Sequence, residues 1–228
     1  SKDTGRVGGK NASLGEMIAT LEGAGIRVPE GFATTAEAYW AFVRTNDLEP
    51  VIRERLGELA PDHANLAEVG GAIRDAVLAG ELPADLVEQI RRAYAAMAED
   101  GEPATVAVRS SATAEDLPQA SFAGQLETYL NVTGADALLD AVKHSLASLF
   151  TDRAIVYREN NDFDHLQVAL SVGVQRMVRS DRACAGVMFS IDTETGFPRA
   201  ILINGAWGLG ETVVQGMVEP DEFQVFKP

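Results

Sequence analysis

The spacing of apolar residues in the first hundred positions is that of amphipathic helices. Apolar residues from Leu14 to Leu21 recur at every third or fourth position, and glycines follow where a helix would end. Thr34 or Thr35 is the expected N-cap of the next helix. Further helices are predicted at 35–43, 50–56, 66–78 and 83–97. Residues 1–102 are therefore expected to form the helix-rich first part of the fold.

The pattern changes after residue 102, where short apolar runs and alternating positions predict strands. Residues 168–174 alternate larger and smaller side chains, which is typical of a strand with one buried face. Other strands are predicted at 105–108, 128–132, 184–190, 200–204 and 222–226, with helices at 135–150 and 152–160. Because strands follow one another without crossover helices, we expect an antiparallel or mixed sheet in 103–228. The predicted fold class is α+β.

Charge and composition narrow the possible partners. The 228 residues are 46% hydrophobic and carry a net charge of −15 without any basic tract, which argues against nucleic-acid and membrane-surface partners. A phosphate site would have to be built locally, from backbone amides and a few placed cations. No apolar run is long enough to span a bilayer. A single cysteine, Cys184, suits a reducing compartment, and we expect a cytoplasmic protein.

Two glycines and a lysine, Gly8, Gly9 and Lys10, stand just before the first predicted helix. Glycines allow the backbone to approach an anion, helix N-terminal amides donate hydrogen bonds, and lysine adds a charge. The pattern is not a P-loop. A P-loop requires glycine at position 4, where this chain has Thr4, and serine or threonine at position 11, where it has Asn11. A phosphate-binding segment and a flexible arm with a capping Asn11 both remain open.

A second candidate begins at Arg109, at the end of a predicted strand. A loop rich in hydroxyl residues and glycine follows from Ser110 to Gly124. Such an arrangement can surround a polyphosphate with a guanidinium and several N–H and O–H donors. The alternative is a surface loop with a solvated arginine, but unstructured loops of about 14 residues are uncommon unless they are functional or disordered.

Other chemistry-bearing residues favour structural roles. The segment 205–211 resembles part of a dinucleotide fingerprint, but a tight turn with a packed Trp207 is the simpler interpretation. Cys184 lies on a predicted strand among apolar neighbours, so we expect a buried and inert thiol. The three histidines are far apart in the sequence, show no metal-ligand spacing, and His144 is expected to be structural. The sequence therefore predicts no metal ligand.

Together the segments resemble, in order, the N-terminal nucleotide-binding region of the phosphoenolpyruvate synthase (pyruvate, water dikinase) family. Pyruvate phosphate dikinase and rifampin phosphotransferase are similar, and the segment DTETGF favours the synthases. The stretches that carry the resemblance are VGGKNASLGEM at 7–17, VPEGFATT at 28–35, 106–128, SLFTDRA at 148–154, FDH at 163–165, DTETGF at 192–197 and 206–222.

The resemblance implies an ATP-grasp fold of the pyruvate phosphate dikinase N-terminal type and binding of ATP. By motif, Lys10 and Arg109 would bind the phosphates, and are the two residues expected to act in catalysis. Gly124 and Thr128 would line the nucleotide pocket, and Gln175 would lie near the adenine. In the family, ATP, pyruvate and water give phosphoenolpyruvate, AMP and phosphate through a phosphohistidine on a mobile carrier domain.

The resemblance also implies that 103–228 is incomplete at its C-terminal end. The carrier domain, the pyruvate-binding domain and the ligands of Mg²⁺ are expected in further segments of the same enzyme, so this chain alone is expected to be inactive. Two alternatives remain open at this stage. One is the ATP-binding part of a rifampin phosphotransferase-like enzyme, and the other is a non-catalytic nucleotide-binding module.

Overall fold

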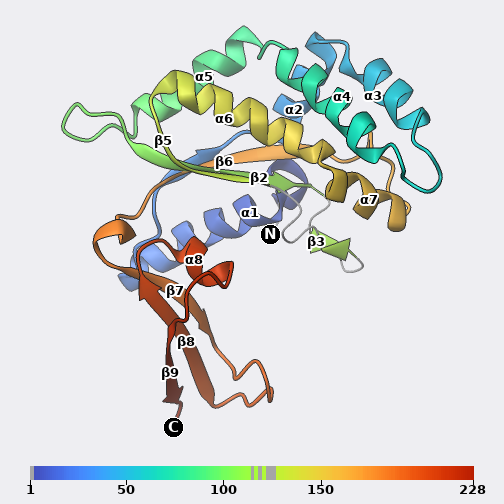
Figure 1. The fold of residues 1–228 in the computed structure, drawn as a ribbon. Helices are drawn as coiled ribbons and strands as arrows, with labels where there is room; N and C mark the ends of the chain where they lie inside the picture. The colour runs from blue at the N-terminus through green and yellow to red at the C-terminus, as the bar shows by residue number, and fades with distance from the viewer. Residues whose placement is uncertain (1–2, 114–115, 118–119, 122–126) are drawn as a thin grey trace. The chain divides into compact units, whose positions relative to one another are not determined.

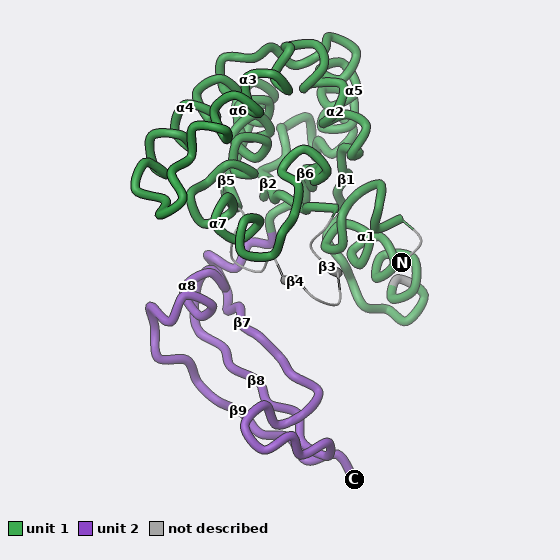
Figure 2. Tube along the Cα trace, turned by 90° about the vertical axis from the view of Figure 1, so that its right-hand side faces the viewer, with its two compact units in different colours: residues 1–177 green, residues 178–228 purple. Residues whose placement is uncertain are grey.

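The computed structural model describes residues 3–113, 116–117, 120–121 and 127–228. It divides into two compact units, residues 1–177 and 178–228, which are described separately (Figure 2). Within the described ranges, no helix combines the length and the apolar character that crossing a bilayer requires.

The predicted helices of the first unit are confirmed. Thr35 is the N-cap of the second helix, since its side chain accepts a hydrogen bond from the Ala38 amide at 3.3 Å. The first helix begins earlier than the periodicity predicts, because the glycines of its motif lie inside it. The helices are α1 Thr4–Leu21, α2 Ala36–Thr45, α3 Leu48–Gly57, α4 Leu66–Ala79, α5 Ala84–Ala95, α6 Ala135–Ala147 and α7 Asp152–Asn160.

A four-stranded sheet in the order β1-β6-β2-β5 forms the centre of this unit, and its strands pair antiparallel, as predicted. Two of its strands differ from the expectation. A short strand that was not predicted precedes α2, and the strand that carries Arg109 runs on to Ala112, so the predicted loop begins later. The strands are β1 Gly31–Ala33, β2 Thr105–Ala112, β5 Thr128–Thr133 and β6 Leu170–Arg176, with a separate hairpin of β3 Asp116–Leu117 and β4 Ala120–Ser121.

The two faces of this sheet differ in chemistry. One face is covered by α2 and α6 and presents the buried side chains of Val108, Val172 and Val174 to the helical layer (Figure 1). The other face presents small and polar residues, and α1 lies across it on the side opposite α6 (Figure 1). Since alternate residues of a strand point to opposite faces, β2 and β6 supply both the core and the floor beneath α1.

A buried polar network secures α7 at the edge of the helical layer. The Arg158 side chain is fully buried over the Phe150 ring, and its Nε donates to Nδ1 of His165 at 2.8 Å. The other ring nitrogen of His165 must then carry the proton, and Nε2 donates to Glu159 Oε1 at 2.6 Å. Burial lowers the pKa of Arg158 to about 10, so the guanidinium stays charged at neutral pH.

This network predicts acid sensitivity. Burial lowers the pKa of His165 below its ordinary value, and the Arg158 cation adds to that shift, although Glu159 opposes it. Below about pH 6.5 the His165 imidazole therefore binds a proton more readily in the unfolded chain than in the folded chain. The free energy of unfolding falls as the pH falls. We expect His165 to contribute a loss of stability between pH 7.5 and 5.5, measured as a fall in the free energy of urea unfolding.

The matched pair for this test is His165→Asn and His63→Asn. A carboxamide oxygen at 165 can accept from Arg158 without titrating, so His165→Asn should flatten the pH dependence. His63 has φ 57° in a turn, a conformation that asparagine adopts readily, and His63→Asn should keep the pH dependence of the parent chain. Equal slopes in the two variants would contradict the assignment.

The second unit is a three-stranded antiparallel sheet, β7 Cys184–Phe189, β8 Ala200–Trp207 and β9 Asp221–Phe226, with the short helix α8 Gly210–Val214. Gly208, with φ 94°, makes the predicted tight turn after β8. Two expectations are wrong: Cys184 is exposed, and Trp207 is 82% exposed rather than packed. Burial was expected for Cys184 from its apolar strand neighbours and for Trp207 from the tight turn, but one five-residue helix cannot cover both faces of a sheet.

Candidate functional site

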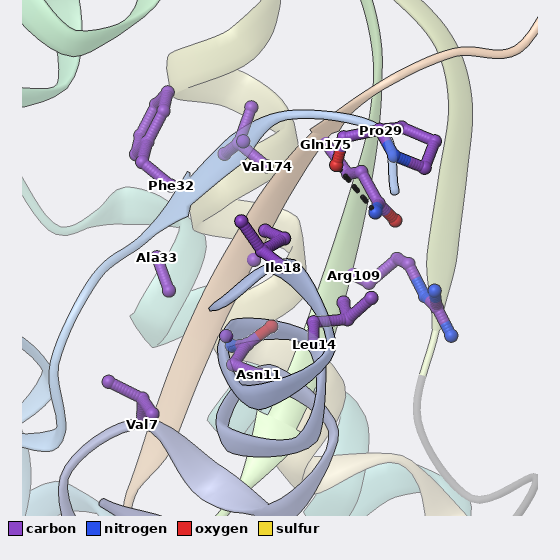
Figure 3. Close-up of a pocket in the computed structure, with 13 residues that line it drawn as sticks. Val7, Asn11, Leu14, Ile18, Pro29, Phe32, Ala33, Arg109, Val174 and Gln175 are labelled. Atoms are coloured by element: carbon purple, nitrogen blue, oxygen red, sulfur yellow. Dashed lines mark hydrogen bonds between the residues drawn. The ribbon is translucent and has the colours of Figure 1, made fainter. Parts of the chain in front are cut away.

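A cavity of about 280 Å³ lies between α1 and the β1–β6 part of the sheet (Figure 3). Its walls are mainly apolar, with Leu14 and Ile18 from α1 and Phe32 from β1. Three polar side chains also line it: Asn11, Arg109 and Gln175. An apolar slot with a few placed polar groups is the usual character of a small-molecule site.

Arg109 stands on β2, in register with Gly173 of β6 on one side and Thr128 of β5 on the other. It is half-buried, and its guanidinium has no hydrogen bond or ion pair with any residue that the structure describes. By contrast, Arg176 pairs with Glu30, and Arg74 pairs with Asp152 at 3.0 Å. Arg109 is thus a cation at a cavity of an acidic protein that remains available for an anionic ligand.

Gln175 reaches the same cavity from β6. It pairs with Ala107 of β2, two residues before Arg109, so the side chains of Gln175 and Arg109 lie on one face of the sheet. Its Nε2 donates to the Pro29 carbonyl at 3.1 Å, which fixes the carboxamide plane (Figure 3). The sequence placed these two residues 66 positions apart, and the antiparallel register brings them together.

The glycine motif lies within α1, which is interrupted at Gly8 (φ 72°, ψ 166°). Gly9 and Lys10 therefore lie in the longer, second stretch of the helix, and of the three residues predicted to precede it only Gly8 does so. Lys10 is half-buried and is not among the residues that line the cavity. Its predicted contact with phosphate stays a prediction.

The remaining predicted site residues lie elsewhere or outside the described ranges. Thr128 is exposed on β5 opposite Arg109 and does not line the cavity. Gly124 lies outside the described residues. The ligand roles of Arg109 and Gln175 also stay predictions, although the structure does bring these two side chains to one cavity.

Asn11 is a site residue that the sequence analysis assigned differently. A capping role for Asn11 was one of two alternatives left open, but its Nδ2 donates to Ser171 Oγ on β6 at 2.9 Å. The one sequence feature that could have marked Asn11 as a site residue is its position next to Lys10 in the glycine motif. The partner, however, lies 160 residues away in the sequence, so no local pattern could identify it.

The side chains that could bind a metal ion are dispersed in the described part of the chain. Across the described part of the chain, no group of three or more histidine, cysteine or acidic residues is placed to hold a metal ion. His144 makes a local contact, in which its Nδ1 lies 2.9 Å from the Asp140 carbonyl one turn earlier in α6.

Comparison with known proteins adds independent information. Residues 4–228 match the family described as pyruvate phosphate dikinase, AMP/ATP-binding domain. The chain is 58% identical over 227 residues to the phosphoenolpyruvate synthases of Pseudomonas aeruginosa and Escherichia coli, covering 99% of the chain and 29% of each relative. It is 48% identical over 228 residues to the probable phosphoenolpyruvate synthase of Methanothermobacter thermautotrophicus, covering 99% of the chain and 32% of that relative.

These matches agree with the segments that the sequence analysis singled out. The chain spans less than a third of the length of the relatives it matches, while the match itself runs along nearly all of the chain. At this identity and coverage, the chain belongs to the pyruvate phosphate dikinase AMP/ATP-binding domain family.

Proposed function

We propose that this chain binds ATP, as the ATP-binding part of a phosphoenolpyruvate synthase. The observation that carries the proposal is the cavity beneath α1, where the available Arg109 cation meets an apolar slot bordered by Gln175. Family membership supports the same ligand, and the names of the three relatives favour a synthase over an antibiotic phosphotransferase.

The chemistry of the cavity suits a nucleotide with a charged tail. Leu14 and Ile18 offer apolar surface to a planar base, and the carboxamide of Gln175 offers hydrogen bonds to the edge of that base. Arg109 extends away from Asn11 and Leu14 in Figure 3, as a phosphate ligand outside the slot would require. Phosphoryl transfer depends mainly on positioning and charge neutralisation, which Arg109 and Lys10 would supply.

We also propose the ATP-grasp architecture for this region. The helices and antiparallel sheets of the structure are compatible with that fold, in which two subdomains close on ATP. Under this proposal, residues 1–102 are the helix-rich first part of the ATP-binding region and 103–228 its β-rich part. Thr128 and Gly124 would then border the nucleotide from the segment that follows β2.

The reaction of the whole enzyme is part of the proposal. The longer protein would convert ATP, pyruvate and water to phosphoenolpyruvate, AMP and phosphate in the cytoplasm. A carrier domain bearing a histidine and a pyruvate-binding domain would be supplied by segments outside this chain. Mg²⁺ would neutralise phosphate charge through ligands from those segments, and this chain's own residues would bind and orient the nucleotide.

The proposal is tested by calorimetric titration of this chain with ATP, in parallel with inorganic triphosphate. We expect saturable binding of ATP with a Kd below about 1 mM, and weaker binding of triphosphate because it lacks the base that fills the slot. If ATP and triphosphate bind equally, the apolar slot does not hold the base. If neither binds, the proposed function fails for this chain.

A further inference from the structure

The seat of α1 on the sheet is built around one pair of serines. Ser111 of β2 and Ser171 of β6 are cross-strand neighbours, and both side chains face α1. Gly8 of α1 lies against Ser111, and Asn11, three residues later, donates to Ser171 Oγ at 2.9 Å. Ser171 in turn donates to the Thr34 carbonyl at 2.6 Å. The hydrogen bonds thus join α1, β6 and the segment before α2.

The fit around this seat leaves little freedom for α1 to shift. A Cβ at Gly8 would lie 2.2 Å from Ser111 Oγ and 2.5 Å from the Ser111 carbonyl oxygen. A Cβ at Gly173 would lie 2.2 Å from Asn11 Oδ1. Glycine at both positions allows α1 to approach so closely that the Asn11 carboxamide reaches β6 directly.

The same seat fixes the groups that border the nucleotide site. Arg109 precedes Ser111 by two residues on β2 and lies on the same face of the sheet. Lys10 follows Gly8 by two residues and precedes Asn11 by one. The position of Lys10 relative to Arg109 is therefore set by how Gly8 and Asn11 sit on the two serines.

We propose that Asn11 is a positioning residue, which acts through its hydrogen bond to Ser171 to hold Lys10 and Arg109 at the separation that a polyphosphate requires. This inference rests on the proposed function. It assigns to Asn11 a role distinct from capping, because Asn11 lies inside α1 and its Nδ2 donates to another element of the fold.

The test uses Ser171→Ala, Asn11→Ala and the double variant, with the affinities of ATP and adenosine measured by calorimetry for each. Ser171 does not line the cavity, so its truncation removes the anchor without removing a wall of the site. The matched control is Ser145→Ala, since Ser145 is equally buried in α6 and its hydroxyl has no partner among the described residues.

We expect each single variant to weaken ATP binding about three- to tenfold, because the hydrogen bond that holds α1 to β6 is lost. Ser171→Ala should leave adenosine binding unchanged, since Ser171 does not line the cavity. The double variant should be no weaker than Ser171→Ala, since the bond that Asn11→Ala removes is already lost when Ser171 is truncated. Ser145→Ala should bind as the parent chain does.

Other outcomes overturn the inference. Equal losses for ATP and adenosine would show a general structural role, and additive losses in the double variant would show that the two residues act separately. Unchanged ATP affinity in Ser171→Ala would show that the hydrogen bond between Asn11 and Ser171 has no role in ATP binding. If the parent chain itself binds no ATP, the proposed function fails, and with it the positioning role that rests on it.

Discussion

Arg109→Ala is expected to lower the affinity for ATP by about 10- to 100-fold, the effect of losing a charge-assisted hydrogen bond to phosphate. The physical reason is the state of this side chain in the structure. Its guanidinium has no partner among the described residues, so removing it breaks no internal ion pair. Binding is measured by calorimetry, and urea unfolding of the variant should differ little from that of the parent chain.

The matched control is Arg153→Ala. Arg153 lies on α7, is exposed, and likewise has no hydrogen bond or ion pair with the described residues. Both variants make the net charge of −15 more negative by the same amount, so a general repulsion of ATP would affect them equally. We expect Arg153→Ala to change the affinity less than twofold.

Arg109→Lys refines the assignment. Lysine keeps the charge but loses the planar fork of donors, so an intermediate affinity is expected if Arg109 binds a phosphate through two hydrogen bonds. An affinity equal to that of the parent chain would mean that charge alone matters. If Arg109→Ala binds ATP unchanged, the phosphate site lies elsewhere in the protein.

Much of the fold could be predicted from local patterns, and the exceptions have identifiable causes. Helices α4 and α7 match their predicted bounds closely because each buries one face over successive turns. Strand β2 was predicted too short because its last residues, Ser110–Ala112, are not typical strand formers. Their pairing with β6 decides the conformation, and that pairing is a tertiary contact.

Some residues of the candidate site could be found from the sequence, and others depend on tertiary contacts. Arg109 and Gln175 were selected by resemblance, and the antiparallel register explains why they reach one cavity. The bond between Asn11 and Ser171 joins residues 160 positions apart, and no pattern in either segment indicates it. The prediction that Cys184 is buried was wrong because apolar neighbours indicate burial only where another layer covers the strand.

Gly8→Ala is expected to destabilise the fold by about 3 kcal/mol or more, because two separate costs meet at this position. The backbone there has φ 72° and ψ 166°, a region that is essentially restricted to glycine. The added methyl group would also lie 2.2 Å from Ser111 Oγ and 2.5 Å from a backbone oxygen. Since the backbone oxygen belongs to the paired strand β2, it cannot move aside without disturbing the sheet.

Gly15→Ala is the control in the same helix. A Cβ at Gly15 meets no atom within 4 Å, and its backbone is helical, so alanine should stabilise the fold by about 0.5–1 kcal/mol. Urea unfolding of the two variants should therefore shift in opposite directions. If Gly8→Ala unfolded like the parent chain, α1 could not be seated on Ser111, because no arrangement that keeps this contact accommodates the methyl group. The cavity that α1 closes, and the positioning role of Asn11, would then lose their common structural basis.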